Sequence, residues 1–194
     1  MGRLSDEHAG LMRRGRWSVG ADDVLSIIRR ARYELYHSAM LAWLLDPLGK
    51  HGLGTTLLEA LLRLCGISAA LDLHRARPEI EVQRSDTRAD IVVFAPGITL
   101  IIENKVDAGE QERQCDRLYA HFGADPGARF VFLTPTGRAP RTASAPGSDA
   151  WTTLSYKMLA TLMDEALNHA AINALATGRF TAQNYLMTLR KEFV

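Results

Sequence analysis

Apolar residues in the first part of the chain recur at the spacing of an amphipathic helix. This pattern predicts a helix over Ala21–Leu45, with Asp22 or Asp23 as its N-cap. A second amphipathic helix is predicted over Thr55–Leu64, because the apolar residues keep the same period and Gly66 follows as a stop signal. We therefore expect the N-terminal part of the domain to be helical.

Further along the chain the apolar positions alternate with polar ones. Ile80 and Val82 are flanked by polar residues, a pattern typical of a strand. The segments Ala89–Ala95 and Ile98–Lys105 are rich in β-branched residues and flank Pro96-Gly97, a turn dipeptide. These features predict three strands, of which the last two form a hairpin.

The second half of the chain mixes both patterns. We expect a long loop over Pro135–Asp149, strands over Arg129–Thr134 and Trp151–Leu154, and helices over Glu110–Phe122, Ser155–His169 and Thr181–Phe193. This order predicts an α/β (α+β) fold in which helices cover one mixed sheet. We interpret residues 1–20 as an N-terminal arm or short helix, and residues 21–194 as a single domain.

The predicted hairpin brings three chemically active side chains together. If Pro96-Gly97 is a two-residue turn, the register places Asp90 directly opposite Glu103. Directly opposed residues point to the same face of a sheet, with Cβ atoms about 4.5–5.5 Å apart. Lys105 lies two residues beyond Glu103 and therefore shares that face. The sequence thus predicts two carboxylates and one ammonium group side by side.

Opposed carboxylates repel each other, so a sheet selected for stability alone avoids such a pair. A divalent cation that binds both Asp90 and Glu103 removes the repulsion, and carboxylate oxygens are usual ligands of Mg²⁺. Such a cation polarises a phosphodiester and makes hydroxide available near neutral pH, while Lys105 can stabilise charge in the transition state. The alternative is that both acids lie at solvated strand ends and that Lys105 is an edge charge.

The segment Arg88–Lys105 resembles the PD-(D/E)XK nuclease superfamily, whose motif is an Asp, a short β-hairpin, then Asp or Glu, any residue, and Lys. Ala89-Asp90 and Glu103-Asn104-Lys105 match this motif, although the usual proline before the Asp is absent. The resemblance implies a restriction-endonuclease-like fold with a central mixed sheet of about four strands flanked by helices, and Mg²⁺ or Mn²⁺ bound by the Asp and the Glu. It points to an uncharacterised branch, because it extends to Glu34–Pro47, Glu103–Tyr119 and Asn184–Leu189.

Other polar residues are candidates for roles at the same site. The resemblance implies that Glu34 reaches the metal directly or through water; the alternative is a solvated or arginine-paired glutamate. Gln111 and Gln114 lie three residues apart on a predicted helix and face the same way. The resemblance implies a glutamine on this helix, which makes them candidate contacts to substrate or to metal-bound water. The alternative for both is an ordinary helix-surface residue.

Clusters of arginine offer candidate contacts to phosphate. Arg88 lies beside the predicted metal site, and Arg138 and Arg141 lie in the long loop. The formal net charge is only +1, so the field of the whole protein does not indicate a nucleic-acid binder, and local clusters matter more. The alternative is that these arginines belong to the solvated surface.

Composition restricts the class of protein further. The chain has 194 residues, 47% hydrophobic and 23% charged, as is typical of a folded domain. No apolar run approaches the roughly 20 residues that cross a bilayer. Cys65 and Cys115 are far apart and show no metal-ligand spacing. We therefore expect a cytoplasmic protein with reduced thiols and no membrane segment.

These observations favour an Mg²⁺-dependent nuclease, with Mn²⁺ as a substitute ion, that hydrolyses phosphodiester bonds of nucleic acid. DNA is favoured over RNA, in defence against foreign DNA or in repair, and a homo-oligomer is compatible with the sequence. One alternative is a catalytically silent member of the fold that binds nucleic acid or protein; the presence of Asp90, Glu103 and Lys105 together argues against it. The other alternative is an RNA-specific nuclease, which shares the same chemistry.

Overall fold

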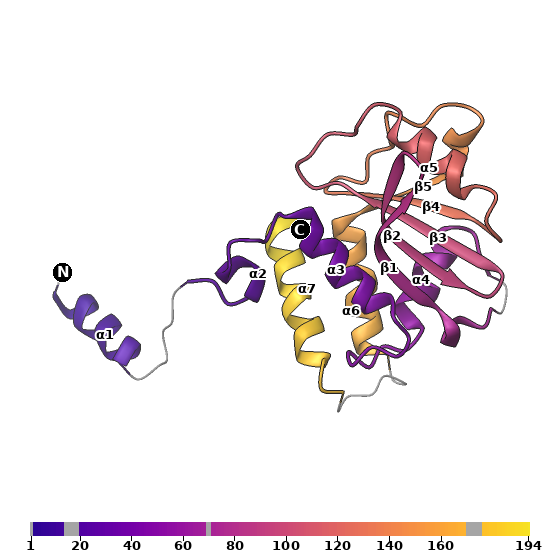
Figure 1. Ribbon diagram of the computed structural model, residues 1–194. Coiled ribbons are helices and arrows are strands. Elements are labelled where there is room, and N and C mark those ends of the chain that lie inside the picture. Colours follow the sequence, from indigo (N-terminus) through magenta and orange to yellow (C-terminus); the bar gives the residue numbers. More distant parts are fainter. Residues whose placement is uncertain (1, 14–19, 69–70, 170–175) are drawn as a thin grey trace.

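The computed structural model describes residues 2–13, 20–68, 71–169 and 176–194 (Figure 1). Its centre is a five-stranded sheet with the strand order β1-β2-β3-β4-β5. The first three strands pair antiparallel, whereas β4 pairs parallel with both β3 and β5. The strands are β1 (Arg77–Arg84), β2 (Thr87–Ala95), β3 (Ile98–Asn104), β4 (Arg129–Thr134) and β5 (Trp151–Ser155). The predicted mixed sheet is confirmed. Its edge strand β5 is the strand expected over Trp151–Leu154, and the total of five exceeds the figure of about four that the resemblance implied.

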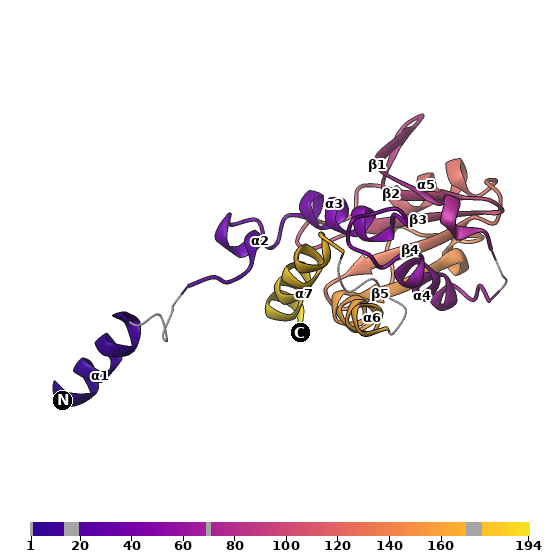
Figure 2. The same cartoon turned by 90° about the horizontal axis from the view of Figure 1, so that it is seen from below.

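Helices cover both faces of this sheet (Figure 2). Apolar residues of α3, α4, α6 and α7 pack on one face, and those of α5 pack on the other. The α-helices are α1 (Gly2–Arg13), α2 (Val24–Ile27), α3 (Glu34–Leu45), α4 (Thr56–Leu64), α5 (Gln114–Phe122), α6 (Tyr156–Asn168) and α7 (Arg179–Phe193), with short 3-10 turns at η1 (Leu73–Arg75) and η2 (Gly147–Ala150).

The alternation of side chains along the central strands explains the two layers. Ile91 and Val93 of β2 belong to the core beneath α3, α4 and α6, whereas Val92 belongs to the core beneath α5. Strand β3 is buried along its whole length, as expected where helices cover both faces of a sheet. Glu103, near the end of β3, is therefore removed from solvent.

The helix predicted over Ala21–Leu45 is wrong as a single element, because the structure divides it into α2 and α3. Arg29 takes a left-handed conformation with φ of 57°, and the Arg30 N–H donates to the Leu25 carbonyl at 2.7 Å. This turn closes the end of α2 and redirects the chain. Of the two predicted N-caps, Asp23 takes the role, since its side chain accepts from the Ser26 N–H.

The helix predicted to begin at Glu110 begins at Gln114 instead. Arg113 has φ of 49°, so the helical geometry cannot extend back through it. The carboxylate of Glu110 accepts hydrogen bonds from Arg138 and from the backbone of Arg141, in the loop between β4 and β5. These long-range bonds hold Glu110 outside the helix, and they also tie down the long loop.

The remaining predicted strands and helices are confirmed to within a few residues. At the N-terminus, α1 forms part of the predicted arm, while residue 1 and residues 14–19 lie outside the described residues. Among the described helices, none combines the length and the apolar character that a membrane span requires.

Candidate active site

The hairpin between β2 and β3 has the register that the turn at Pro96-Gly97 predicts. Ala95 pairs with Ile98, and the ladder continues to the pair Ile91 and Ile102. The next two residues in this register are Asp90 and Glu103, so the sheet places these acids next to each other. At this separation the negative charge of Asp90 acts on the carboxyl group of Glu103.

Glu103 is completely buried, and its two carboxylate oxygens differ in their surroundings. Oε1 accepts from the Lys105 ammonium and from the side-chain amide of Gln114, each at 2.6 Å. Oε2 is also buried, but it accepts no hydrogen bond within the described part of the chain. A buried carboxylate oxygen without a donor is costly unless a cation compensates it.

The protonation of the two acids reflects this shared burial. Desolvation and the negative charge of Asp90 raise the pKa of Glu103 to about 8, although Lys105 opposes the shift. Burial also raises the pKa of Asp90, against the attraction of Lys105 and the Asn104 N–H, which donates to Asp90 Oδ2 at 2.7 Å. Burial and the like charge of the neighbouring acid thus disfavour ionisation of Glu103 when no cation is bound.

Lys105 lies directly after β3 and is buried, with 8% of its surface exposed. Burial disfavours its charged form, but Glu103, Asp90 and Glu34 outweigh this effect and raise the pKa of the ammonium. The backbone N–H of Lys105 donates to the Leu133 carbonyl of β4 at 2.9 Å. The lysine is thus charged and held in place at neutral pH.

Asn104, the middle residue of the motif, connects the site to the helices, a role that the sequence analysis missed. Its side-chain amide donates to the Glu34 carbonyl and to Ser38 Oγ of α3, both at 3.1 Å. Its Oδ1 accepts from the Tyr156 hydroxyl of α6 at 2.7 Å. An amide at the end of an otherwise apolar strand was the available signal, but its partners lie far away in the sequence.

Glu34 lies at the start of α3 and lines a cleft that Asp90 and Lys105 also line, but its carboxylate is engaged by backbone groups. Oε1 accepts from the Val106 N–H at 2.7 Å and from the Ala108 N–H at 3.2 Å. Among the described residues, no three His, Cys, Asp or Glu side chains form a ready ligand group. The structure therefore brings Asp90 and Glu103 together as a pair, with Glu34 beside them.

The two glutamines take different positions. Gln114 is buried on the first turn of α5 and donates to Glu103. Gln111 precedes the helix, so the prediction that both face the same way on one helix is wrong. Instead the Gln111 N–H donates to Gln114 Oε1 at 3.0 Å. Gln111 thus supports the orientation of Gln114 through its backbone.

Asp90 opens into a polar cleft of about 390 Å³, and Glu103 is buried behind it, next to the lining residues Lys105 and Gln114. Asp90, Lys105, Glu34, Arg88 and both glutamines line it, and Gln83, Asp86, Thr87 and Arg117, which the sequence analysis did not single out, line it as well. A hollow of about 220 Å³ adjoins the cleft, since Lys105 and Ala108 line both.

The predicted phosphate contacts are distributed unevenly around these spaces. Arg88 lines the cleft but pairs with Glu81 at 3.1 Å, and Arg138 lines the adjoining hollow but pairs with Glu110 at 2.5 Å. Arg141 is exposed and lines neither space. The charge of two of the three named arginines is therefore already compensated by a carboxylate.

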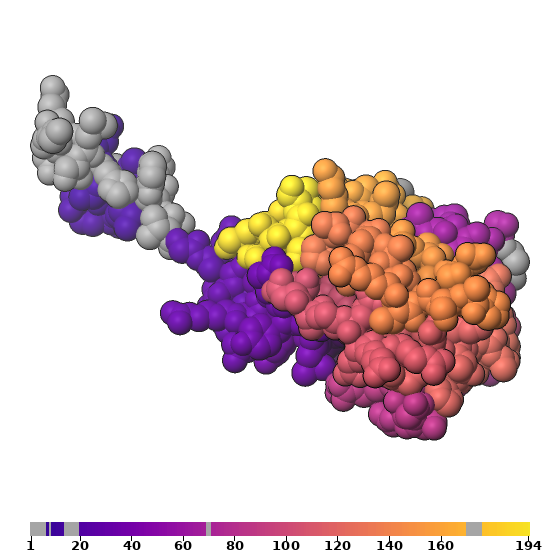
Figure 3. Space-filling model, turned by 90° about the horizontal axis from the view of Figure 1, so that it is seen from above, coloured from indigo at the N-terminus to yellow at the C-terminus, as the bar shows by residue number. Residues whose placement is uncertain are grey.

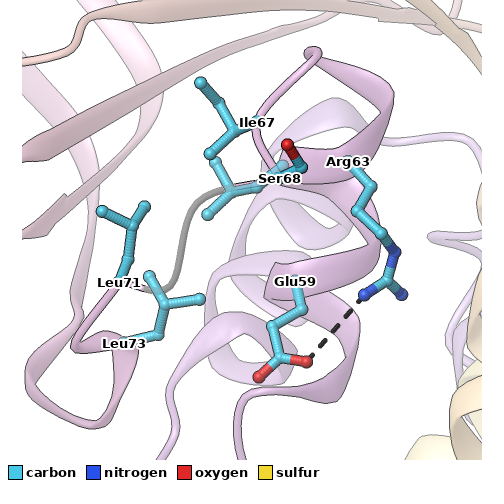
Figure 4. Close-up of a pocket in the computed structure, with 7 residues that line it drawn as sticks. Glu59, Arg63, Ile67, Ser68, Leu71 and Leu73 are labelled. Atoms are coloured by element: carbon cyan, nitrogen blue, oxygen red, sulfur yellow. Dashed lines mark ion pairs between the residues drawn. The ribbon is translucent and has the colours of Figure 1, made fainter.

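A separate hollow of about 390 Å³ lies beside α4 (Figure 4). Its lining shares no residue with the cleft, and it is mostly apolar. Its charged residues, Glu59 and Arg63, form an exposed contact of 4.0 Å within the helix. It offers no group for phosphodiester chemistry and does not belong to the candidate site.

Comparison with known proteins gives one match. The model of the PD-(D/E)XK nuclease superfamily matches residues 22–187, a span that contains the whole sheet and the cleft. No curated protein and no solved structure matches the chain.

Proposed function

The chain belongs to the PD-(D/E)XK nuclease superfamily, and from this premise we propose that it is an Mg²⁺-dependent nuclease whose site is Asp90, Glu103 and Lys105. The observation that carries the proposal is the buried Oε2 of Glu103, which lies beside a second carboxylate and for which the described residues offer no donor. This arrangement destabilises the empty site and suits a divalent cation, which is bound by oxygen ligands.

Asp90 and Glu103 would hold the cation, and Glu34 would contribute directly or through water. A bound divalent ion supplies Lewis-acid polarisation of the phosphodiester and neutralises developing negative charge. The protein itself prepares the ligands. Lys105 and Gln114 hold Oε1 of Glu103, which leaves Oε2 available, and the Asn104 N–H fixes Asp90.

Lys105 has a second task in this proposal. Its ammonium lines the cleft and stays charged at neutral pH, so it can stabilise the negative charge that develops on the phosphoryl oxygens. Gln114, Gln111 and the arginines Arg88, Arg138 and Arg141 would contact the substrate around it. Stabilisation of charge on the phosphoryl oxygens does not depend on the sugar. The proposed preference for DNA over RNA therefore rests on how the substrate fits the cleft.

The proposed setting is the reducing cytoplasm, in which Cys65 and Cys115 would remain the free thiols observed here. Manganese is proposed to replace magnesium, because it accepts the same oxygen ligands. Defence against foreign DNA and DNA repair are both compatible with such an enzyme, and a homo-oligomer is compatible with the fold.

The test is incubation of the purified chain with plasmid, linear duplex, single-stranded DNA and single-stranded RNA. Each substrate is combined with Mg²⁺, Mn²⁺ or EDTA. We expect cleavage with either metal, none with EDTA, and faster cleavage of DNA. An Asp90→Asn protein purified in parallel controls for contaminating nucleases. Absence of cleavage in every combination, by a protein that still binds nucleic acid or a protein partner, would favour the silent binding module instead.

A further inference from the structure

The connection between α2 and α3 carries arginines whose charge is not compensated. Arg29 is exposed and Arg30 is half-buried, and within the described ranges neither forms an ion pair. Arg32 pairs with Asp107 and lies 4.0 Å from Glu192. Cations held at a surface without acidic partners are free to bind external anions. This distinguishes Arg29 and Arg30 from Arg88 and Arg117 of the cleft, which already pair with carboxylates.

The same segment exposes aromatic and aliphatic side chains. Tyr33 is 54% exposed, and the Arg30 guanidinium lies 4.5 Å from the centre of its ring. Tyr36 meets Tyr33 edge to face, with ring centroids 6.2 Å apart. Ile27, at 60% exposure, extends this apolar surface along α2. We call residues 27–36 the connector surface.

The connector surface borders the candidate active site. It lines a hollow of about 480 Å³ together with Lys191 and Glu192 of α7. In Figure 3 the purple segment that contains it lies at the surface beside the yellow end of α7. Tyr33 immediately precedes Glu34, which lines the cleft, and Arg32 is bonded to Asp107, two residues after Lys105. A nucleic-acid strand that leaves the cleft can therefore reach the connector surface directly.

We propose that the connector surface binds a single-stranded segment of nucleic acid next to the cleft, an inference that rests on the proposed function. Single strands offer both binding partners that this surface needs. Their phosphates are anions for Arg29 and Arg30, and their unstacked bases present apolar faces to Tyr33 and its neighbours. A duplex hides its base faces, so it satisfies only the arginines.

A second copy of the chain fits this surface less well. A two-fold contact brings the same patch together on both subunits, and here it would place arginine against arginine. A single-stranded nucleic acid offers phosphates to the arginines and base faces to the exposed apolar side chains at the same time. The surface accordingly assigns to the enzyme a preference for substrates with a single-stranded tail, flap or end.

The test measures binding of labelled single-stranded and duplex oligonucleotides by fluorescence anisotropy in EDTA, where no cleavage occurs. We expect the single strand to bind more tightly. Tyr33→Ala should weaken its binding by roughly tenfold, because base stacking is lost, whereas Tyr33→Phe keeps the ring and the affinity. Arg29→Gly removes a cation and suits the left-handed backbone, so it should lower the salt dependence without unfolding the protein.

Matched controls lie elsewhere on the surface. Phe180→Ala removes an exposed aromatic ring from α7, and Arg63→Gln removes an exposed cation from α4; both should bind like the wild type. Unchanged affinity in Tyr33→Ala and Arg29→Gly, with cleavage intact, would overturn the connector surface alone. Equal or tighter duplex binding, or loss of dimerisation as the main effect of Tyr33→Ala, would also overturn it. If the wild type neither binds nor cleaves nucleic acid, the proposed function fails as well.

Discussion

The side-chain amide of Gln114 donates a 2.6 Å hydrogen bond to Oε1 of Glu103, from the first turn of α5 to the end of β3. Lys105 donates to the same oxygen at the same distance. Two donors on one oxygen fix the carboxylate in a single orientation, and the other oxygen has no partner among the residues that the structure describes. The position of α5 therefore decides how the carboxylate of Glu103 is oriented beside Asp90.

This relationship predicts different roles for the two glutamines. Gln114→Ala removes a buried donor from Glu103, and we expect it to lower kcat by roughly tenfold to a hundredfold through misplacement of the acid. Gln111→Ala should lower kcat by less than Gln114→Ala does, because its bond to Gln114 comes from the backbone N–H and only the proposed substrate contact of its side chain is lost. Single-turnover cleavage of one substrate by both variants provides the comparison. Equal losses in the two proteins would contradict the geometry.

Asp90→Asn should abolish cleavage, while Lys105→Met should reduce turnover by about 10²–10³-fold and leave some activity. The difference arises because Asp90 is proposed as a metal ligand and Lys105 as a stabiliser of transition-state charge. Calorimetric titration with Mn²⁺ separates the roles: we expect Asp90→Asn to lose metal binding and Lys105→Met to retain it. Retained metal binding in Asp90→Asn would remove this acid from the ligand set.

Glu34 can be tested by two substitutions that differ in one property. Glu34→Gln keeps an oxygen that accepts from the Val106 and Ala108 N–H groups, whereas Glu34→Ala removes it. If the carboxylate serves the metal, both variants should need more Mg²⁺, and added Mn²⁺ should partly restore their activity. Wild-type metal dependence in Glu34→Gln, together with a loss in Glu34→Ala, would assign Glu34 a purely structural role.

The raised pKa of Glu103 predicts a pH-dependent cost to folding in the absence of metal. The unfolded chain ionises this residue near its ordinary pKa of 4.5, whereas the folded chain keeps the proton up to about 8. Stability should therefore fall as the pH rises through this window, by up to about 1.4 kcal/mol per pH unit. Glu103→Gln should remove this dependence, be more stable than the wild type in EDTA, and be inactive. Urea denaturation at about three pH values between roughly 5 and 8 measures how the free energy of unfolding of each protein changes with pH.

Glu110 should produce the opposite dependence at lower pH. Burial alone would raise its pKa, but hydrogen bonds from Arg138, Arg141 and Thr142 outweigh burial and lower the pKa to about 2. The ionised carboxylate stabilises the fold above its ordinary pKa of 4.5, and this stability is lost as the pH falls toward 2. Glu110→Gln should cost on the order of 3 kcal/mol at neutral pH and flatten the acid limb of the stability curve.

Hydrogen exchange locates the effect of Glu110→Gln. The backbone N–H groups of Arg141 and Thr142 should exchange faster than in the wild type, because they donate to Glu110. The exposed neighbour Glu112 supplies the control, and Glu112→Gln should leave both the exchange and the acid limb unchanged. Unaltered exchange in Glu110→Gln would show that other contacts hold this loop.

Local patterns in the sequence were enough to predict the sheet and the acid pair. Period-two alternation and a turn at Pro96-Gly97 determine which residues of β2 and β3 pair, because each step along an antiparallel ladder is fixed by the previous one. The placement of Asp90 beside Glu103 follows from that register. The buried strands were predictable for the same reason, since apolar runs bounded by turn residues leave few alternatives.

Tertiary contacts decided the rest, because they join residues far apart in the sequence. Glu110 lies outside its predicted helix, because its carboxylate accepts hydrogen bonds from a loop near residue 141, and α5 therefore begins later than predicted. The role of Asn104 depends on α3 and α6, whose residues form hydrogen bonds with its side-chain amide in the folded chain. The unpaired oxygen of Glu103 arises in the same way, since burial and competition for donors depend on the completed fold. Short-range periodicity contains no information about long-range hydrogen bonds, burial or competition for donors, so only the packed structure determines these contacts.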